Sequence, residues 1–146
     1  MADILEIENG TMGEIIEFAD YGSQMLALKG DENPKEIVSK INQFVSDAKE
    51  QKRQFSQDEI LALGILLGWQ YVNGLQWEWG EAVWDGDIDT SAIGVLNADN
   101  SLFNNPMAWM NSVLNSDRVP NFLLNYNMVA GNKVPKAQPN EARMFH

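Results

Sequence analysis

Cysteine is absent from the 146-residue sequence, and histidine occurs once, as the last residue, His146. The missing cysteine excludes disulfides, thiolate nucleophiles, iron–sulfur clusters and cysteine-type zinc sites. A histidine general base or a Ser-His-Asp triad would need a residue at a chain end, where order is usually low. We therefore expect a protein that is not an enzyme and that has no cofactor and no metal site.

Positive charge is also scarce, because 10 Lys and Arg residues stand against 21 Asp and Glu, for a formal net charge of −11. Binding to nucleic acid or to anionic lipid needs clustered positive charge, so neither is the expected partner. The longest apolar run, Ile60 to Trp69, is too short to span a bilayer. The first residues lack the pattern of a signal peptide, which predicts a cytoplasmic location.

The first half of the chain has helical patterns with recognisable starts. A helix is expected from Thr11, in a capping box with a glutamate three residues later, and another from residue 34, after the N-cap Asn33. A third begins after Ser56 and is apolar on nearly all sides, which indicates a buried central helix. Gly64 and Gly68 share one of its faces, where we expect another backbone to pack closely rather than a membrane dimer.

From residue 75 the apolar period changes to two, which predicts strands over 76–84, 91–96 and 101–103. Asn105 caps an expected short helix over 106–114, and residues 121–129 alternate as a closing strand. Residues 132–146 are polar and lack periodicity, so they are expected to form a loose C-terminal tail after a single domain over 1–131. The predicted fold class is α+β, with N-terminal helices packed on a small antiparallel β-sheet and a short inserted helix.

One stretch of the sequence resembles a known group of proteins. The apolar run 62–69 with its two glycines is followed by a Trp-bearing segment (75–79), a hairpin strand (92–96), the sequence Phe-Asn-Asn-Pro (103–106) and the segment 122–127. This order over about residues 56–130 resembles a family of small bacterial domains of unknown function. Domains of this kind resemble the immunity partners of bacterial secreted toxins, which is an association and assigns no catalytic residues.

The distribution of charge is the most informative feature. No Lys or Arg lies between Arg53 and Arg118, and the residues between them carry a formal −9. One interpretation is a solvated acidic face that aids solubility; the other is a surface that attracts a basic partner. Trp84 is the expected exposed anchor beside the acidic turn. The candidate partner-binding residues are Glu78, Glu81, Trp84, Asp85, Asp87, Asp89 and Asp99.

Two other chemistries fit the sequence less well. The alternating carboxylates of 85–89 suggest a calcium loop, but Thr90 and Leu96 stand where such a loop needs Gly and Glu. An acidic turn is the better interpretation. Glu78 and Glu81 would make a glycosidase pair only if they faced one cleft, whereas residues three apart on a strand point to opposite faces.

The sequence thus favours a cytoplasmic bacterial immunity protein, which binds and neutralises a cognate, basic toxin protein through the acidic surface. The alternative is a small ligand-binding module for a glycan or a peptide, in which exposed Trp and Asn side chains form the site.

Overall fold

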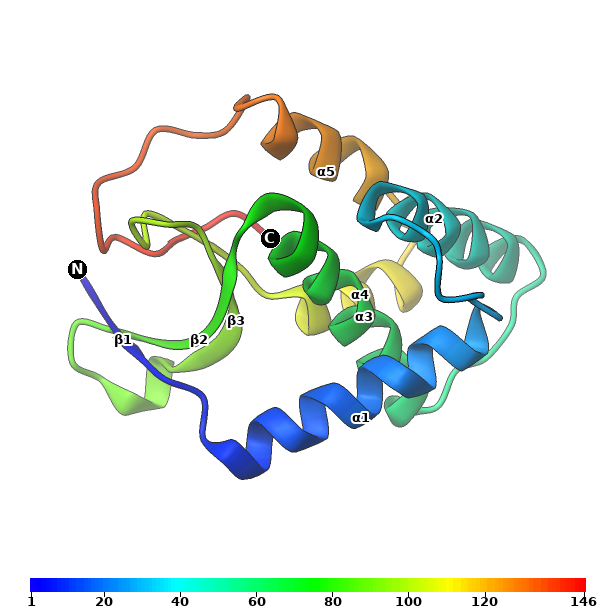
Figure 1. Ribbon diagram of the computed structural model, residues 1–146, viewed down its shortest axis with the longest axis horizontal. Coiled ribbons are helices and arrows are strands. Elements are labelled where there is room, and N and C mark those ends of the chain that lie inside the picture. Colours follow the sequence, from blue (N-terminus) through cyan, green and yellow to red (C-terminus); the bar gives the residue numbers. More distant parts are fainter.

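The computed structural model describes residues 1–146 and has an α+β fold with one long central helix (Figure 1). Helices α1, α2, α4 and α5 surround α3, and a curved sheet lies at one end of the helical layer. No helix combines the length and the apolar character that crossing a membrane requires. The elements are β1 Ala2–Leu5, α1 Asn9–Met25, α2 Pro34–Glu50, α3 Gln57–Leu75, β2 Glu78–Trp84, a 3-10 turn Ile88–Thr90, β3 Ala92–Leu96, β4 Leu102–Asn104, α4 Pro106–Leu114, α5 Phe122–Ala130 and β5 Arg143–Met144.

Helix α3 starts where its sequence predicts. The Ser56 side chain accepts from the Glu59 backbone N–H, and the Glu59 carboxylate accepts from the Ser56 N–H, which completes a capping box. These bonds satisfy two N–H groups that have no partner within the helix, and the backbone bond from Ser56 lowers the pKa of Glu59. From Ala62 to Gly68 every residue is buried, so α3 is the core of the molecule.

Both glycines of α3 are sites of close packing, and the predicted approach of another backbone occurs at Gly64, whereas Gly68 meets side chains. A Cβ on Gly64 would lie 2.8 Å from the Met107 Cα, and one on Gly68 would lie 2.5 Å from the Trp79 ring. Gly22 in α1 has the same role, because a Cβ there would lie 2.7 Å from the Ala62 carbonyl oxygen of α3. Glycine therefore sets how closely α1, α4 and β2 approach the central helix.

The predicted start of the first helix at Thr11 is wrong. Helix α1 begins at Asn9, its N-cap residue is Glu8, and no side chain caps it. The cause is the preceding segment, which the sequence interpretation left without structure. Residues Ala2–Leu5 pair antiparallel with β2, and the chain turns into α1 directly after this strand.

The sheet has the order β1-β2-β3-β4-β5. Its first four strands pair antiparallel, but β5 runs parallel to β4. The sheet is therefore mixed, whereas the sequence predicted an antiparallel sheet. The Ala2 N–H also donates to the Asn140 carbonyl oxygen (2.8 Å), which connects β1 to the segment that leads into β5. The outer face of this curved sheet has its own small core, which consists of Ala2, Ala82, Leu96, Phe103 and Ala142.

The predicted closing strand over 121–129 is wrong, because Phe122–Ala130 forms helix α5. Its buried residues, Phe122, Asn125 and Tyr126, recur at the three- and four-residue spacing of a helix. The short apolar run fits either period, and its surroundings decide between them. Helix α5 packs against α2, where the Asn42 side chain accepts from the Leu123 N–H (3.3 Å).

The segment after residue 131 differs from the predicted loose tail. Ala142 is fully buried, the Phe145 N–H donates to the Phe103 carbonyl oxygen (2.8 Å), and the His146 ring stacks on Trp109 with centroids 4.1 Å apart. Burial, with a smaller effect from the charge of Arg118, lowers the pKa of His146. Only two residues of the segment, Arg143–Met144, form a strand, and their partners lie in β4, so no local pattern of the sequence could reveal the pairing.

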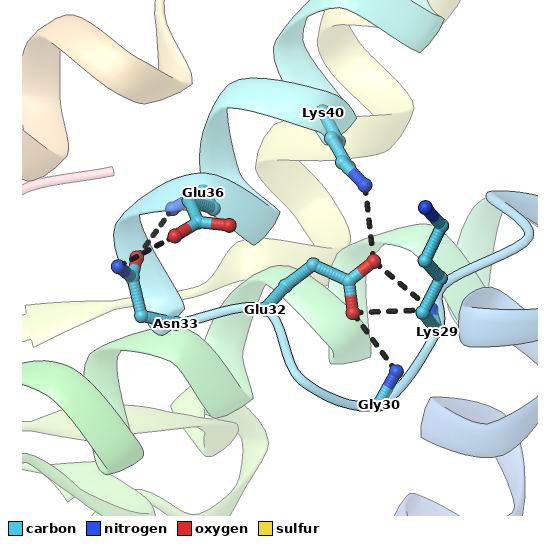
Figure 2. Close-up of polar contacts among 6 residues, drawn as sticks. All are labelled: Lys29, Gly30, Glu32, Asn33, Glu36 and Lys40. Carbon is cyan, nitrogen blue, oxygen red and sulfur yellow. Dashed lines mark hydrogen bonds and ion pairs between the residues drawn. The ribbon is translucent and has the colours of Figure 1, made fainter.

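One carboxylate organises the loop between α1 and α2 (Figure 2). Glu32 accepts hydrogen bonds from the backbone N–H groups of Lys29 (2.9 Å) and Gly30 (2.9 Å) and from Lys40 Nζ (3.0 Å). The Asn33 side chain then accepts from the Glu36 N–H (2.9 Å) and caps α2, as predicted. The hydrogen bonds that Glu32 accepts lower its pKa from 4.5 to about 2, with the Lys29 backbone bond as the largest cause.

We expect the change Glu32→Gln to lower the melting temperature at neutral pH and to weaken its acid dependence. A folded-state pKa below the unfolded one stabilises the fold fully above pH 4.5, and that contribution is lost as the pH falls toward about 2. Thermal unfolding of wild type and variant between pH 7 and pH 2.5 measures it. Asp31→Asn is the control, because this neighbouring exposed carboxylate makes no side-chain hydrogen bond or ion pair. Parallel curves for wild type and Glu32→Gln would contradict the assignment.

Candidate binding surface

The two stretches of the chain that contain no Lys or Arg adjoin one another in the fold. Residues 1–28 contain six acids and residues 54–117 contain nine, and neither stretch has a Lys or Arg. Because β1 pairs with β2, the two stretches adjoin, and together they supply β1, α1, α3, the β2–β3 hairpin, β4 and α4. All ten Lys and Arg lie in the α1–α2 loop, in α2 and just after it, or after residue 117. In Figure 1, β1, α1 and the hairpin lie below and to the left, while α2 and α5 lie above.

We use the name acidic surface for eight carboxylates that lie on β1, between β1 and α1, in the first half of α1, and in the β2–β3 hairpin from Glu81 onward. Most of these side chains are exposed, and Glu81 is half-buried. None of them has a Lys or Arg partner within 4 Å; the ion pairs to Lys and Arg in the molecule are Glu32–Lys40 and Glu59–Arg53. Asp85 lies 3.6 Å from the N-terminal ammonium of Met1, and the other carboxylates of the surface have no ion pair, so most of their negative charge is uncompensated. The acidic surface consists of Asp3, Glu6, Glu14, Glu17, Glu81, Asp85, Asp87 and Asp89.

The predicted acidic turn is one exposed loop between β2 and β3. Asp85 and Gly86 both have positive φ, at 54° and 72°, which suits an Asp-Gly turn. The Asp87 side chain accepts from the Asp89 N–H (3.0 Å), and the Thr90 hydroxyl donates to the Asp87 carbonyl oxygen (2.7 Å). No three carboxylates of the molecule are grouped so that they could hold a metal ion. The turn is held by its own hydrogen bonds and leaves its charges facing solvent.

The other predicted acids lie in different places. Glu78 is opposite Leu96 and Glu81 is opposite Ile93, so these two glutamates point to opposite faces of β2. Asp99 lies in the β3–β4 turn, at the far end of β3 from the Asp85–Asp89 turn. Hydrogen bonds from Ser101, first from its side chain and then from its backbone, lower the pKa of Asp99, which gives this carboxylate a role in shaping the turn. Of the predicted acids, the structure thus groups Asp85, Asp87 and Asp89, with Glu81 further along β2.

Trp84 is half-buried and contacts other residues of the same chain. It is therefore not the exposed anchor that the sequence suggested. Its indole N–H donates to the Ala142 carbonyl oxygen (3.2 Å), and its ring packs edge-on against Phe103 with centroids 5.3 Å apart. The C-terminal segment covers it, and the pattern of β2 alone cannot show that. Trp84 therefore stabilises the outer core of the sheet beside the acidic turn.

The sequence interpretation missed the N-terminal part of the acidic surface, namely Asp3, Glu6, Glu14 and Glu17. A signal for them was present, because residues 1–28 also lack Lys and Arg. What the sequence could not show is that β1 pairs with β2, so that Asp3 lies opposite Val83 and diagonal to Glu81. The pairing joins two separate acidic stretches into one surface.

A group of buried polar side chains lies between α3, β4 and α5. Tyr71 donates its hydroxyl hydrogen to the Asn125 side chain, and burial raises the pKa of Tyr71. Asn104 is fully buried beside them in β4, and its amide atoms have no partner. All three side chains are buried and so are not part of the exposed candidate surface, and the Tyr71–Asn125 bond connects α3 to α5.

Comparison with known proteins shows the fold but no family. No protein-family model matches the chain, and no curated protein matches it. The chain is similar to a protein of Bacteroides thetaiotaomicron VPI-5482, whose crystal structure was determined at 1.50 Å resolution, with a TM-score of 0.64 and 20% identity. The similarity covers 90% of this chain and 48% of that protein, so the chain spans about half the length of its structural relative. The resemblance to immunity proteins stays a prediction.

Proposed function

We propose that the chain is a cytoplasmic bacterial immunity protein, which binds a basic toxin protein through the acidic surface and neutralises it by occlusion. The observation that carries this proposal is the segregation of charge. Every Lys and Arg lies outside β1, α1 and the β2–β3 hairpin, and the carboxylates there have no Lys or Arg partner. A field of one sign steers a partner of opposite sign and raises the rate of association.

The toxin's own chemistry supplies a reason for its positive charge. Many proteins that cleave nucleic acids are basic because they bind phosphate. An acidic protein that covers such a groove presents the same sign of charge as the nucleic acid and excludes it. This mechanism needs complementary charge and steric fit, and it needs no turnover by the immunity protein.

The alternative, a glycan- or peptide-binding module, receives less support from the aromatic residues. Stacking on a sugar needs an exposed tryptophan face, but Trp77 and Trp109 are buried. Trp69 and Trp79 are half-buried, pack edge to face on each other and have buried indole nitrogens. Trp84 is held by the C-terminal segment.

Capture of the partner from an extract of the bacterium that encodes the chain tests the proposal. The wild-type chain should retain one basic protein in near-equal amount, which salt releases. A variant with Asp85→Asn, Asp87→Asn and Asp89→Asn should retain at least about tenfold less at low salt, because each lost charge costs on the order of 0.5 kcal/mol. Asparagine keeps the turn, since it tolerates positive φ and its side-chain oxygen can still accept from the residue 89 N–H.

The matched control changes the charge equally at acids outside the acidic surface. Asp31→Asn, Glu50→Gln and Asp117→Asn alter three exposed acids near the cationic segments, and Asp117 lines the same hollow as Lys49, Lys52 and Arg53. The control variant should retain the partner like wild type. If both variants lose the partner equally, the loss is due to the change in net charge and not to the position of the acids. If the hairpin variant retains the partner like wild type, the Asp85–Asp89 turn is not part of the binding surface.

A further inference from the structure

The acidic surface adjoins an apolar pocket between four elements. The pocket has a volume of about 170 Å³ and one acidic side chain, Glu14, in its lining. Helix α1 supplies one wall, α3 the floor, and β3 and α4 the remaining sides. Its apolar lining consists of Ile15, Phe18, Leu61, Ile65, Ile93 and Met107.

Carboxylates from three elements lie around this pocket. Glu14 of α1 lines it directly, and Glu81 of β2 lies opposite Ile93, so the two side chains share a face of the sheet. Asp58 is exposed one turn before Leu61 on α3, which places it on the same side of that helix. None of the three has a Lys or Arg partner, and every lining residue comes from a stretch without Lys or Arg.

The pocket has the size of a single side chain. An apolar protein cavity of about 150 Å³ holds one benzene molecule, so about 170 Å³ accommodates a phenyl ring or a leucyl group. Stable protein interfaces combine such a desolvated apolar anchor with a polar rim that keeps water out. In this molecule Trp84 does not supply the anchor, because it packs against Phe103 and bonds to Ala142. The pocket can instead receive an apolar anchor that the partner supplies.

We propose that this pocket receives one apolar side chain of the basic partner protein, and that lysine or arginine residues flanking it pair with Glu14, Glu81 and Asp58. The inference rests on the proposed function and deepens it, since it names the chemistry of the partner's contact residues. The charge of the rim selects the partner: an apolar group carried with a cation binds, and the same group carried with an anion is repelled.

Methyl NMR of the full chain, titrated with 2-phenylethylamine and separately with 3-phenylpropionate, tests the pocket without the partner. The two probes share a ring that fits the pocket and differ in the sign of their charge. The ammonium probe should shift the methyl signals of Ile15, Ile65 and Ile93 in a saturable way, and the carboxylate probe should bind at least about fivefold more weakly. Ile16 and Ile37 are internal controls, since they line a separate hollow.

Two variants separate the apolar from the charged contribution. Leu61→Trp fills the pocket from a half-buried position and should abolish both sets of shifts. Glu14→Gln should keep binding of the ring but reduce the preference for the ammonium probe. Equal binding of the two probes to wild type, or shifts of Ile16 and Ile37 in place of the pocket methyls, would overturn the inference; a misfolded variant leaves this wild-type comparison intact.

The outcomes also separate this inference from the proposed function. If the probes bind as expected but no basic protein associates with the chain, the proposed function fails and the pocket stands as a site for cationic amphiphiles. If a basic protein associates through the acidic surface and neither probe shifts the pocket methyls, the pocket inference alone fails.

Discussion

Replacing Gly64 by valine should destabilise the fold by about 3 kcal/mol, the upper end of the usual cost of overpacking a core. A Cβ at this position would lie 2.8 Å from the Met107 Cα and 2.9 Å from the Pro106 carbonyl oxygen. Both atoms belong to the backbone of α4, whose first turn is fixed by the Asn105 cap, so no side-chain rotation relieves the contact. Urea unfolding followed by tryptophan fluorescence measures the change.

Gly13→Ala is the matched control for this substitution. Gly13 is also a helical glycine, but a Cβ there would meet no atom within 4 Å. Alanine at that position should stabilise the protein by about 0.5–1 kcal/mol, because it lowers the entropy of the unfolded chain. If both variants change stability by similar amounts, the close approach of α4 to α3 is not what makes Gly64 necessary.

Deleting residues 132–146 should cost about 4 kcal/mol or more, since it uncovers the outer core of the sheet and removes apolar contacts of Val134 and Phe145 with the main core. It also removes β5 and the bond from the Ala2 N–H to the Asn140 carbonyl oxygen. A denaturant titration of the truncated chain against the full chain measures this cost.

A point substitution checks that the cost comes from packing. Ala142→Glu introduces a charge at a fully buried position beside Trp84 and should destabilise strongly, whereas Lys133→Ala, at an exposed position of the same segment, should not. An unchanged unfolding midpoint after truncation would support the loose tail that the sequence suggested.

The sequence predicted most where the information is local. The caps at Asn33, Ser56 and Asn105 set the starts of α2, α3 and α4, because each needs only a side chain and a backbone N–H three residues later. The same locality explains the failures. Residues 122–130 fit a strand or a helix by pattern, and only their packing on α2 makes them a helix. Strand β1 and the paired C-terminal segment depend on partners far along the chain.

The candidate binding surface likewise has one part that the sequence could predict and one part that it could not. The stretch without Lys or Arg and the acidic turn at Asp85–Asp89 are readable from the sequence. The contribution of β1 and α1 is not, because it arises from the pairing of β1 with β2. The pocket beside Glu14 and Ile93 is a product of tertiary packing among four elements, and no spacing in the sequence indicates it.

The proposed function depends on the negative charge of the β2–β3 hairpin, which has no Lys or Arg partner, attracting a basic protein. This claim is tested most directly by the association rate of the purified pair as a function of salt concentration, for wild type, the hairpin variant and the matched control. The proposal predicts that the wild-type rate falls steeply with salt, and that the hairpin variant associates more slowly with a flatter dependence. The control variant should follow wild type. Identical rates and slopes for wild type and the hairpin variant would contradict the claim.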